Sequence, residues 1–138
     1  MARRYVDVNV FVYWLGGHPE YGQRALEWIR EIEKAPNGAY ITASLTVFEL
    51  VVIMSRLTGA RLGDTHLITT ILEALGSLKG LKIVETLYSD YVEALNLMKT
   101  YKLDFEDAIH LAVAMRVNAK EIVSNDADFD NTPLKRVF

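Results

Sequence analysis

The sequence predicts an α/β protein in which helices cover both faces of a mostly parallel sheet. Short segments rich in β-branched and aromatic residues alternate with longer helical segments along the whole chain. This alternation is typical of parallel sheets, because two parallel strands must be joined by a crossover, and the crossover is usually a helix. The chain has 138 residues, 51% of them apolar, which is enough for one domain with its own core. We therefore expect a single domain over residues 1–138.

Local residue patterns place the elements of this fold. Strands are expected at Arg3–Val8, Ala39–Thr42, Leu81–Val84, Glu121–Ser124 and, at an edge of the sheet, Lys135–Phe138. Helices are expected at Val10–Leu15, Pro19 to about Ala35, Leu45 to about Leu57, Leu67 to about Leu78, Ser89 or Asp90 to about Tyr101, and from the start signal at Asp104 to Val117. Ser44, Asp64 or Thr65, and Asp104 are the expected N-caps, and Gly59 is expected to end the third helix.

Composition excludes several classes of protein. No run of eighteen apolar residues could span a membrane, and the two arginines near the N-terminus are not followed by the apolar segment of a signal peptide. The sequence has no cysteine, so it has neither disulfides nor thiolate chemistry, and we expect a cytoplasmic protein. A net charge of −3 argues against general nucleic-acid coating, but it does not exclude an enzyme that binds phosphates through metal ions.

Two carboxylates sit where a purely structural role explains them poorly. The segment from Ala108 to Val117 is almost wholly apolar, so its helix should be buried, yet it opens with Asp104, Glu106 and Asp107. Asp104 can be explained as an N-cap, and Glu106 can be exposed to solvent. Asp107, in contrast, lies one turn inside the helix, on the side that packs against the rest of the protein. Alone, it would be read as a carboxylate that favours the helix dipole. Glu49 is harder to dismiss, because a carboxylate in so apolar a helix is costly unless it is paired or binds a cation.

The predicted topology brings distant acids together. Ligands of open parallel sheets bind beyond the carboxyl ends of the strands. Asp7 and Asp126 follow the first and fourth predicted strands, while Asp107 starts the helix that feeds the fourth strand, and Glu49 lies about one turn from the same edge. Asp126 and Asp7 could each be an ordinary turn or capping residue. The convergence of four acids nevertheless indicates a site, since they cannot all be ionised without a counter-charge.

The donor set indicates the chemistry of this site. Carboxylate oxygens without cysteine favour a hard cation, Mg²⁺ or Mn²⁺, over zinc. Enzymes that hydrolyse phosphodiesters commonly bind such ions in acidic clusters, where the metal activates water and neutralises charge on the phosphate. At least one acid of the cluster should have a raised pKa in the metal-free protein, because burial and mutual repulsion both favour the neutral form.

Four segments, in order and in spacing, resemble the acidic motifs of PIN-domain ribonucleases. They are Tyr5–Val10, Leu45–Leu50, Leu103–Ala112 and Ile122–Phe129, so the resemblance covers essentially the whole chain. It implies a three-layer α/β/α fold and Mg²⁺- or Mn²⁺-dependent endonuclease activity on RNA. It also implies catalytic, metal-binding acids at Asp7, Glu49, Asp107 and Asp126.

Further residues match supporting positions of the same motifs. Asn9, Thr46 and Ser124 correspond to polar positions that often support the acidic cluster, and Asp104 and Asp128 are extra acids that some members carry. His110 is expected to face packing and to have no catalytic role. The short chain resembles the VapC-like toxins of toxin–antitoxin pairs, which implies a homodimer and an antitoxin partner. The apolar helix around Phe48 to Met54 is the expected dimer face.

Other classes remain as alternatives. A non-catalytic PIN-like scaffold would be expected to lose acids, and this sequence keeps all four. A Mg²⁺-binding receiver-like regulatory domain needs an aspartate at the end of its third strand, where this sequence has Glu85 and Thr86 after Val84. A phosphatase of the haloacid dehalogenase type needs two acids after its first strand, and here Asp7 is followed by Asn9. A metal-dependent cleavage assay on RNA separates these classes.

Overall fold

The computed structural model describes residues 3–138, which form a five-stranded parallel sheet covered by helices. The strands are β1 (Arg3–Val6), β2 (Tyr40–Ala43), β3 (Leu81–Val84), β4 (Ala119–Val123) and β5 (Lys135–Val137). The helices are α1 (Val8–Leu15), α2 (Gly22–Lys34), α3 (Ser44–Thr58), α4 (Thr65–Gly76), α5 (Tyr88–Tyr101) and α6 (Phe105–Arg116), with a 3-10 segment at Ala127–Asn131. The predicted fold class is therefore confirmed, and every described strand pair is parallel rather than merely most of them.

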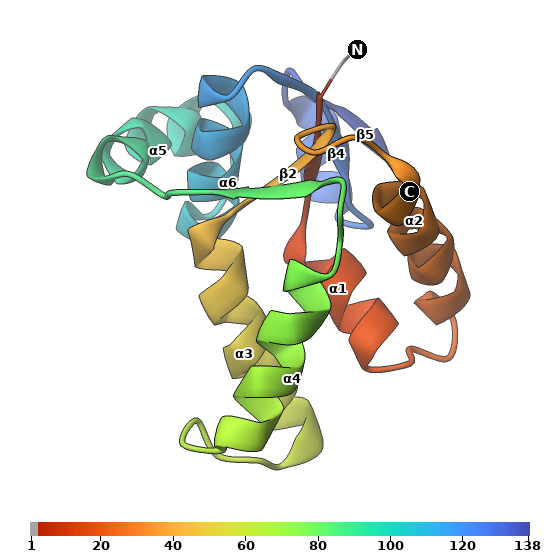
Figure 1. Ribbon diagram of the computed structural model, residues 1–138. Coiled ribbons are helices and arrows are strands. Elements are labelled where there is room, and N and C mark those ends of the chain that lie inside the picture. The colour runs from red at the N-terminus through yellow and green to blue at the C-terminus, as the bar shows by residue number, and fades with distance from the viewer. Residues whose placement is uncertain (1–2) are drawn as a thin grey trace.

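The strand order is β3-β2-β1-β4-β5, so the first strand lies at the centre of the sheet. Receiver domains have the order 2-1-3-4-5, and the sheet therefore excludes the receiver-like alternative. Figure 1 shows α1 and α2 on one side of the sheet, α5 and α6 on the other, and α3 and α4 extending together away from it. Among residues 3–138, no helix combines the length and the apolar character needed to cross a membrane.

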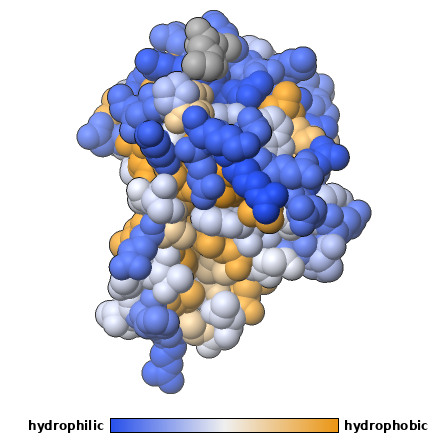
Figure 2. Space-filling view, turned by 45° about the vertical axis from the view of Figure 1, so that its right-hand side comes forward, coloured by the Kyte–Doolittle hydropathy of each residue, from blue (hydrophilic) through white to orange (hydrophobic). Residues whose placement is uncertain are grey.

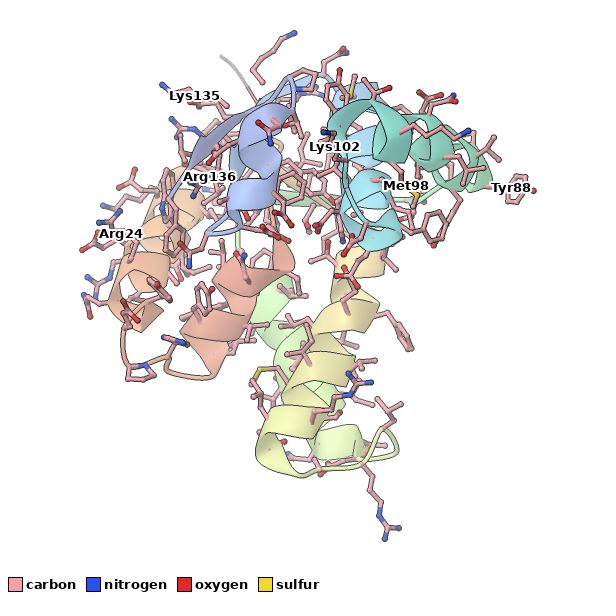
Figure 3. The ribbon with its side chains drawn as sticks, turned by 180° about the vertical axis from the view of Figure 1, so that it is seen from behind. Arg24, Tyr88, Met98, Lys102, Lys135 and Arg136 are labelled. Carbon is pink, nitrogen blue, oxygen red and sulfur yellow. The ribbon has the colours of Figure 1, made fainter. Side chains whose placement is uncertain are left out.

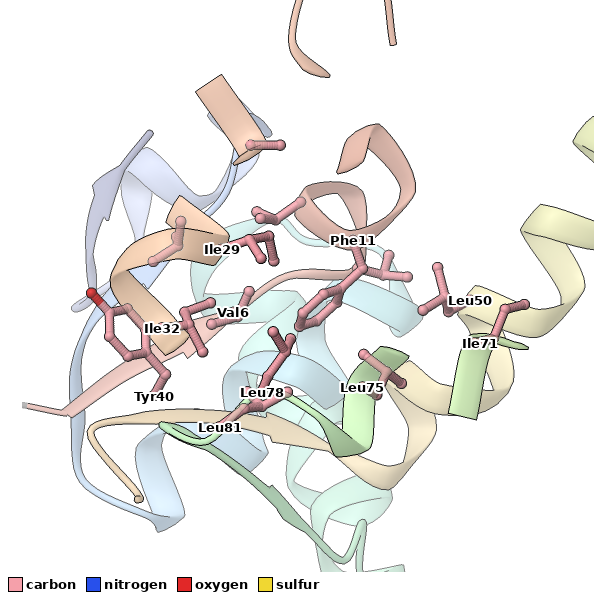
Figure 4. Close-up of a cluster of buried hydrophobic side chains, with 14 of the residues drawn as sticks. Val6, Phe11, Ile29, Ile32, Tyr40, Leu50, Ile71, Leu75, Leu78 and Leu81 are labelled. Atoms are coloured by element: carbon pink, nitrogen blue, oxygen red, sulfur yellow. The ribbon is translucent and has the colours of Figure 1, made fainter. Parts of the chain in front are cut away.

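Alternation along the central strands separates two cores. Tyr5 and Ile122 point into the core beneath α5 and α6, whereas their neighbours Val6 and Val123 point into the opposite core. Figure 4 shows this second core, in which side chains of the sheet and of α1 to α4 interdigitate; it includes Val6, Phe11, Ile29, Ile32, Tyr40, Leu50, Ile71, Leu75, Leu78 and Leu81. The two cores fix the sheet rigidly, and with it the loops at its carboxyl edge.

Several boundaries differ from those expected. The first strand ends at Val6 and α1 begins at Val8, because the side chain of Asp7 accepts a hydrogen bond from the Val8 N–H and caps the helix. The second helix begins at Gly22 rather than Pro19, because His18 Nδ1 accepts hydrogen bonds from the backbone N–H groups of residues 20 and 21 and holds them in a turn. Ser44 does not cap α3; its hydroxyl accepts a hydrogen bond from the Thr86 N–H instead.

Other local predictions are confirmed. Asp64 caps α4, Asp104 caps α6, and Gly59 ends α3 in the left-handed conformation that glycine tolerates, with φ of 71°. Arg116 near the end of α6 forms a two-pronged ion pair with the buried Asp90 of α5, at 2.9 Å on both prongs. This pair fixes α5 against α6, and thereby sets where the first turn of α6 lies.

Candidate active site

The predicted site acids lie at the carboxyl edge of the sheet. Asp7 follows β1, Asp126 follows β4 by two residues, and Asp107 lies in the first turn of α6. The negative charges of Asp7 and Asp126 both act on Asp107, and that of Glu49 acts on Asp7. Acidic oxygens, drawn red in Figure 3, gather where α1, α6 and the 3-10 segment approach one another. The topology thus brings four acids from distant parts of the sequence into one neighbourhood.

Three of the acids form a tight group. One carboxylate oxygen from each of Asp107, Asp126 and Asp128 lies within 4.8 Å of the other two. Asp128 was expected to play only a supporting part, but the 3-10 segment folds it back so that its N–H donates to Asp126 Oδ1 at 2.9 Å. The carboxylate of Asp128 is therefore as well placed for a cation as those of Asp107 and Asp126. Asp7 and Glu49 lie outside this group of three.

The hydroxyl of Ser124 joins two of the acidic segments. It is fully buried, donates to Asp7 Oδ2 at 2.6 Å and accepts from the Asp126 N–H at 3.0 Å. The Nδ2 group of Asn9 also donates to it, at 3.4 Å. Ser124 and Asn9, which the sequence analysis expected as supporting residues, are thus linked to Asp7 and Asp126 by hydrogen bonds. One small side chain fixes the distance between the end of β1 and the loop after β4.

Glu49 has a partner that the sequence analysis missed. His110 Nε2 lies 2.6 Å from Glu49 Oε1, and His110 Nδ1 lies 2.5 Å from the Tyr5 hydroxyl. The His110 side chain is 1% exposed, as expected for a packed residue, but its packing delivers a hydrogen bond to a site acid. The available signal was the spacing of Asp107 and His110, which puts both on one face of α6. The predicted supporting residue Thr46 is also buried, 2.8 Å from the hydroxyl of Thr42.

Burial and crowding raise the pKa values of several acids, which confirms the prediction that at least one would be raised. The pKa of Asp107 is raised from 3.8 to about 7, first by burial and then by the charges of Asp104, Asp126, Asp7 and Glu106. Burial also raises the pKa of Asp7, against the hydrogen bond from Ser124. With a pKa of about 7, Asp107 is partly protonated at neutral pH in the metal-free protein.

The pKa of Glu49 shifts in the opposite direction, downward, because Glu49 is paired with His110. Burial acts to raise the pKa of Glu49, but the hydrogen bond and charge of His110 outweigh it and lower the pKa. Burial acts to lower the pKa of His110, but Glu49, Asp7 and Glu106 outweigh it and raise the pKa. Glu106 is exposed, as expected, yet it also interacts with Glu49. This interaction between the two carboxyls, with burial second, raises the pKa of Glu106 to about 7.

Two buried oxygens in this neighbourhood lack a donor among the described residues. They are Glu49 Oε2 and Asn9 Oδ1. Within residues 3–138, the one donor that could serve Glu49 Oε2 is a proton on the Glu106 carboxyl. Both atoms are acceptors, and a buried acceptor without a donor is costly unless a cation or water satisfies it. The three convergent aspartates by themselves offer an all-oxygen donor set, and the two unpartnered oxygens lie on residues that flank it. That set fits a hard divalent cation such as Mg²⁺ or Mn²⁺.

Comparison with known proteins agrees with this geometry. A sequence model described as the PIN domain matches residues 4–135. No curated protein matches the chain. Among solved structures, VapC20 of Mycobacterium tuberculosis, described as a sarcin-ricin loop cleaving toxin, is 14% identical, with 96% of this chain and 98% of that chain covered and a TM-score of 0.73.

Two further structures have the same fold. A toxin–antitoxin complex from Klebsiella pneumoniae is 21% identical, with 98% of this chain and 96% of that chain covered and a TM-score of 0.69. VapBC2 from Rickettsia felis, bound to a DNA fragment from its promoter, is 17% identical, with 98% of both chains covered and a TM-score of 0.64. At these identities the likeness concerns the fold.

Proposed function

The chain belongs to the PIN-domain family, and we propose that it is a metal-dependent endoribonuclease, the toxin of a toxin–antitoxin pair. The observation that carries the proposal is the convergence of Asp107, Asp126 and Asp128 beside Asp7 and Glu49. The neighbouring charges of Asp126 and Asp7 help to raise the pKa of Asp107, and capping does not account for a third aspartate beside Asp126 and Asp128. A site that binds a divalent cation and a phosphodiester accounts for their placement.

The residues of the chain divide the work of such a site. Asp7, Glu49, Asp107 and Asp126 would hold Mg²⁺ or Mn²⁺, and Asp128 is placed to join them. When bound, the ion supplies a water of lowered pKa and neutralises charge on the phosphate. Ser124 holds the carboxylate of Asp7 in one orientation, and Asn9 in turn donates to the Ser124 hydroxyl. Asp104 caps α6, so that the first turn and Asp107 stay in place.

Basic residues flank one side of the acidic site and suit an RNA backbone. Arg136 donates to the Ser124 carbonyl at 3.3 Å and pairs with Asp130, and its charge acts on Asp126. Figure 3 shows Arg136, Lys135 and Arg24 on the same side of the molecule. Exposed side chains such as Lys135 and Arg24 bind phosphates without reading sequence, so this side would contact the RNA backbone, with the partly buried Arg136 adding positive charge.

The test is cleavage of a generic single-stranded RNA, with a matching DNA strand as control. We expect cleavage with Mg²⁺ or Mn²⁺ and none with EDTA. Asp107→Asn should abolish cleavage while the protein stays folded, because the swap keeps the shape and removes a charged ligand; Glu49→Gln should do the same. Comparable cleavage by the Asn variant at matched metal concentration would refute the assignment, and a chain inert under all conditions would favour the non-catalytic PIN-like scaffold.

Partners follow from the same proposal. Two of the solved structures described above are toxin–antitoxin assemblies, which supports an antitoxin as the protein partner. A cytoplasmic site of action is part of the same proposal. The expected homodimer face needs revision in detail, because Leu50, Val51 and Met54 of α3 are buried in the chain's own core, while Phe48 is 62% exposed. Figure 2 shows orange, hydrophobic surface over the part of the molecule formed by α3 and α4. We propose that Phe48 and neighbouring apolar surface form the contact between two copies.

A further inference from the structure

Three side chains form a buried hydrogen-bonded chain that leads from the core to the site. Tyr5 on β1 contacts His110 on α6, and His110 contacts Glu49 on α3. Tyr5 is fully buried and His110 is 1% exposed, so water cannot replace either partner. The three residues come from three different elements, and each contact joins a different pair of them. Packing alone does not require two hydrogen bonds as short as 2.5 and 2.6 Å in series.

The direction of the hydrogen bonds follows from the atoms involved. The carboxylate of Glu49 can only accept, so His110 Nε2 carries the proton between them. This holds whether Nδ1 accepts from the Tyr5 hydroxyl or is itself protonated and donates to the phenol oxygen. In both cases the hydroxyl of Tyr5 fixes the plane of the imidazole, and the imidazole fixes Oε1 of Glu49. The second oxygen, Oε2, is then held in place, buried and without a donor of its own.

We propose that Tyr5 and His110 are positioning residues, which hold the carboxylate of Glu49 in one orientation so that its Oε2 is presented to the site. The inference rests on the proposed function, since Oε2 would be presented to the cation. A carboxylate that rotates freely must lose that freedom when it binds a cation, and one that is already fixed loses none. Partners that orient a ligand in this way typically change metal affinity 10- to 100-fold when removed.

A pair of amide substitutions at His110 separates positioning from packing. In His110→Gln the amide nitrogen lies as many bonds from Cβ as Nε2 does, so a donor to Glu49 remains and the link to Tyr5 is lost. In His110→Asn the amide nitrogen corresponds to Nδ1, so the donor to Glu49 is lost. Both variants remove the ring and its packing. Tyr5→Phe removes the hydroxyl alone, and Tyr40→Phe is its control, since Tyr40 is also buried in the sheet but its hydroxyl accepts from Arg4, away from the acids.

The measurement is the Mn²⁺ dissociation constant of the metal-free protein by calorimetry, with circular dichroism to confirm folding. We expect His110→Asn to weaken binding about tenfold or more and His110→Gln by no more than about threefold. Tyr5→Phe should weaken binding by about two- to threefold, in line with the Gln variant, which also loses the link to Tyr5, and Tyr40→Phe should leave it unchanged. Equal affinities for the Gln and Asn variants, or for the two Tyr→Phe variants, would overturn the inference. If the native chain itself binds no Mn²⁺, the proposed function fails; if it binds Mn²⁺ and these pairs do not differ, only the positioning inference fails.

Discussion

Removal of the Asp107 charge should stabilise the metal-free protein and remove much of its response to metal. The pKa of Asp107 is raised from 3.8 to about 7, a shift of roughly three units, which for a fully buried group corresponds to about 4 kcal/mol of unfolding free energy lost at pH 7. Asp107 is only partly buried, and screening by water reduces this to about 2 kcal/mol. Asp107→Asn also gives up a favourable interaction with the helix dipole of about 0.5 kcal/mol.

The net expectation for Asp107→Asn in EDTA is a gain of about 1.5 kcal/mol, or a Tm higher by about 5 °C for a chain of this length. With Mn²⁺ at a hundredfold excess over its dissociation constant, the native chain should gain about 2.7 kcal/mol, or roughly 10 °C. The variant should gain much less, because it has lost a charged ligand. The assay is thermal unfolding at pH 7, with EDTA and then with millimolar Mn²⁺. A variant that melts below the native chain in EDTA, or equal metal shifts for both chains, would show that the acids do not form one site.

Three further outcomes are expected. The metal-free native chain should lose stability as pH rises from about 4 to 7. The pKa of Asp107 is raised in the folded state, so its contribution to stability is complete at low pH and is lost as pH rises through the folded value of about 7. Urea midpoints at several pH values measure this, and a rise in stability over this range would contradict it. Leu50→Ala should cost about 3 kcal/mol in urea unfolding, because Leu50 is fully buried, and a loss under about 1 kcal/mol would show a loosely packed core. Light scattering should show a dimer at micromolar concentration, and Phe48→Glu should give a monomer with an unchanged circular dichroism spectrum; a native monomer would exclude the proposed contact.

The fold was predictable because local signals and global topology agree. Each strand is a short segment between turn or helix signals, and each of the first three crossovers contains α-helix, so the parallel sheet followed from the order of elements. Helix starts were predictable where a side chain caps its own helix, as at Asp64 and Asp104. They were missed where the decisive partner is remote or of an unusual kind: Ser44 bonds to Thr86, and His18 holds the turn that delays α2.

The site was predictable to the level of which segments meet. Topology places Asp7, Glu49, Asp107 and Asp126 at one edge, and the sequence shows that much. It does not show rotamers, and these decide that Asp128 turns back towards Asp107 and that Glu49 turns towards His110. His110 was assigned to packing because it lies one turn deeper in its helix than Asp107 and faces the packed side. Periodicity considers one helix at a time, so it could not show that His110 of α6 and the half-buried Glu49 of α3 are hydrogen-bonding partners.

Ser124 also gives the protein an order of assembly. Its N–H donates to the carbonyl of Val137 in β5, its own carbonyl accepts from Arg136, and its hydroxyl holds Asp7 near the start of the chain. A ribosome makes Asp7 early and the strand that steadies Ser124 some 130 residues later. Before β5 is present, the backbone of Ser124 lacks both of these partners, and the hydroxyl that joins Asp7 to the loop after β4 is less firmly held. The last strand of the sheet, which carries none of the acids, therefore completes the arrangement in which they meet.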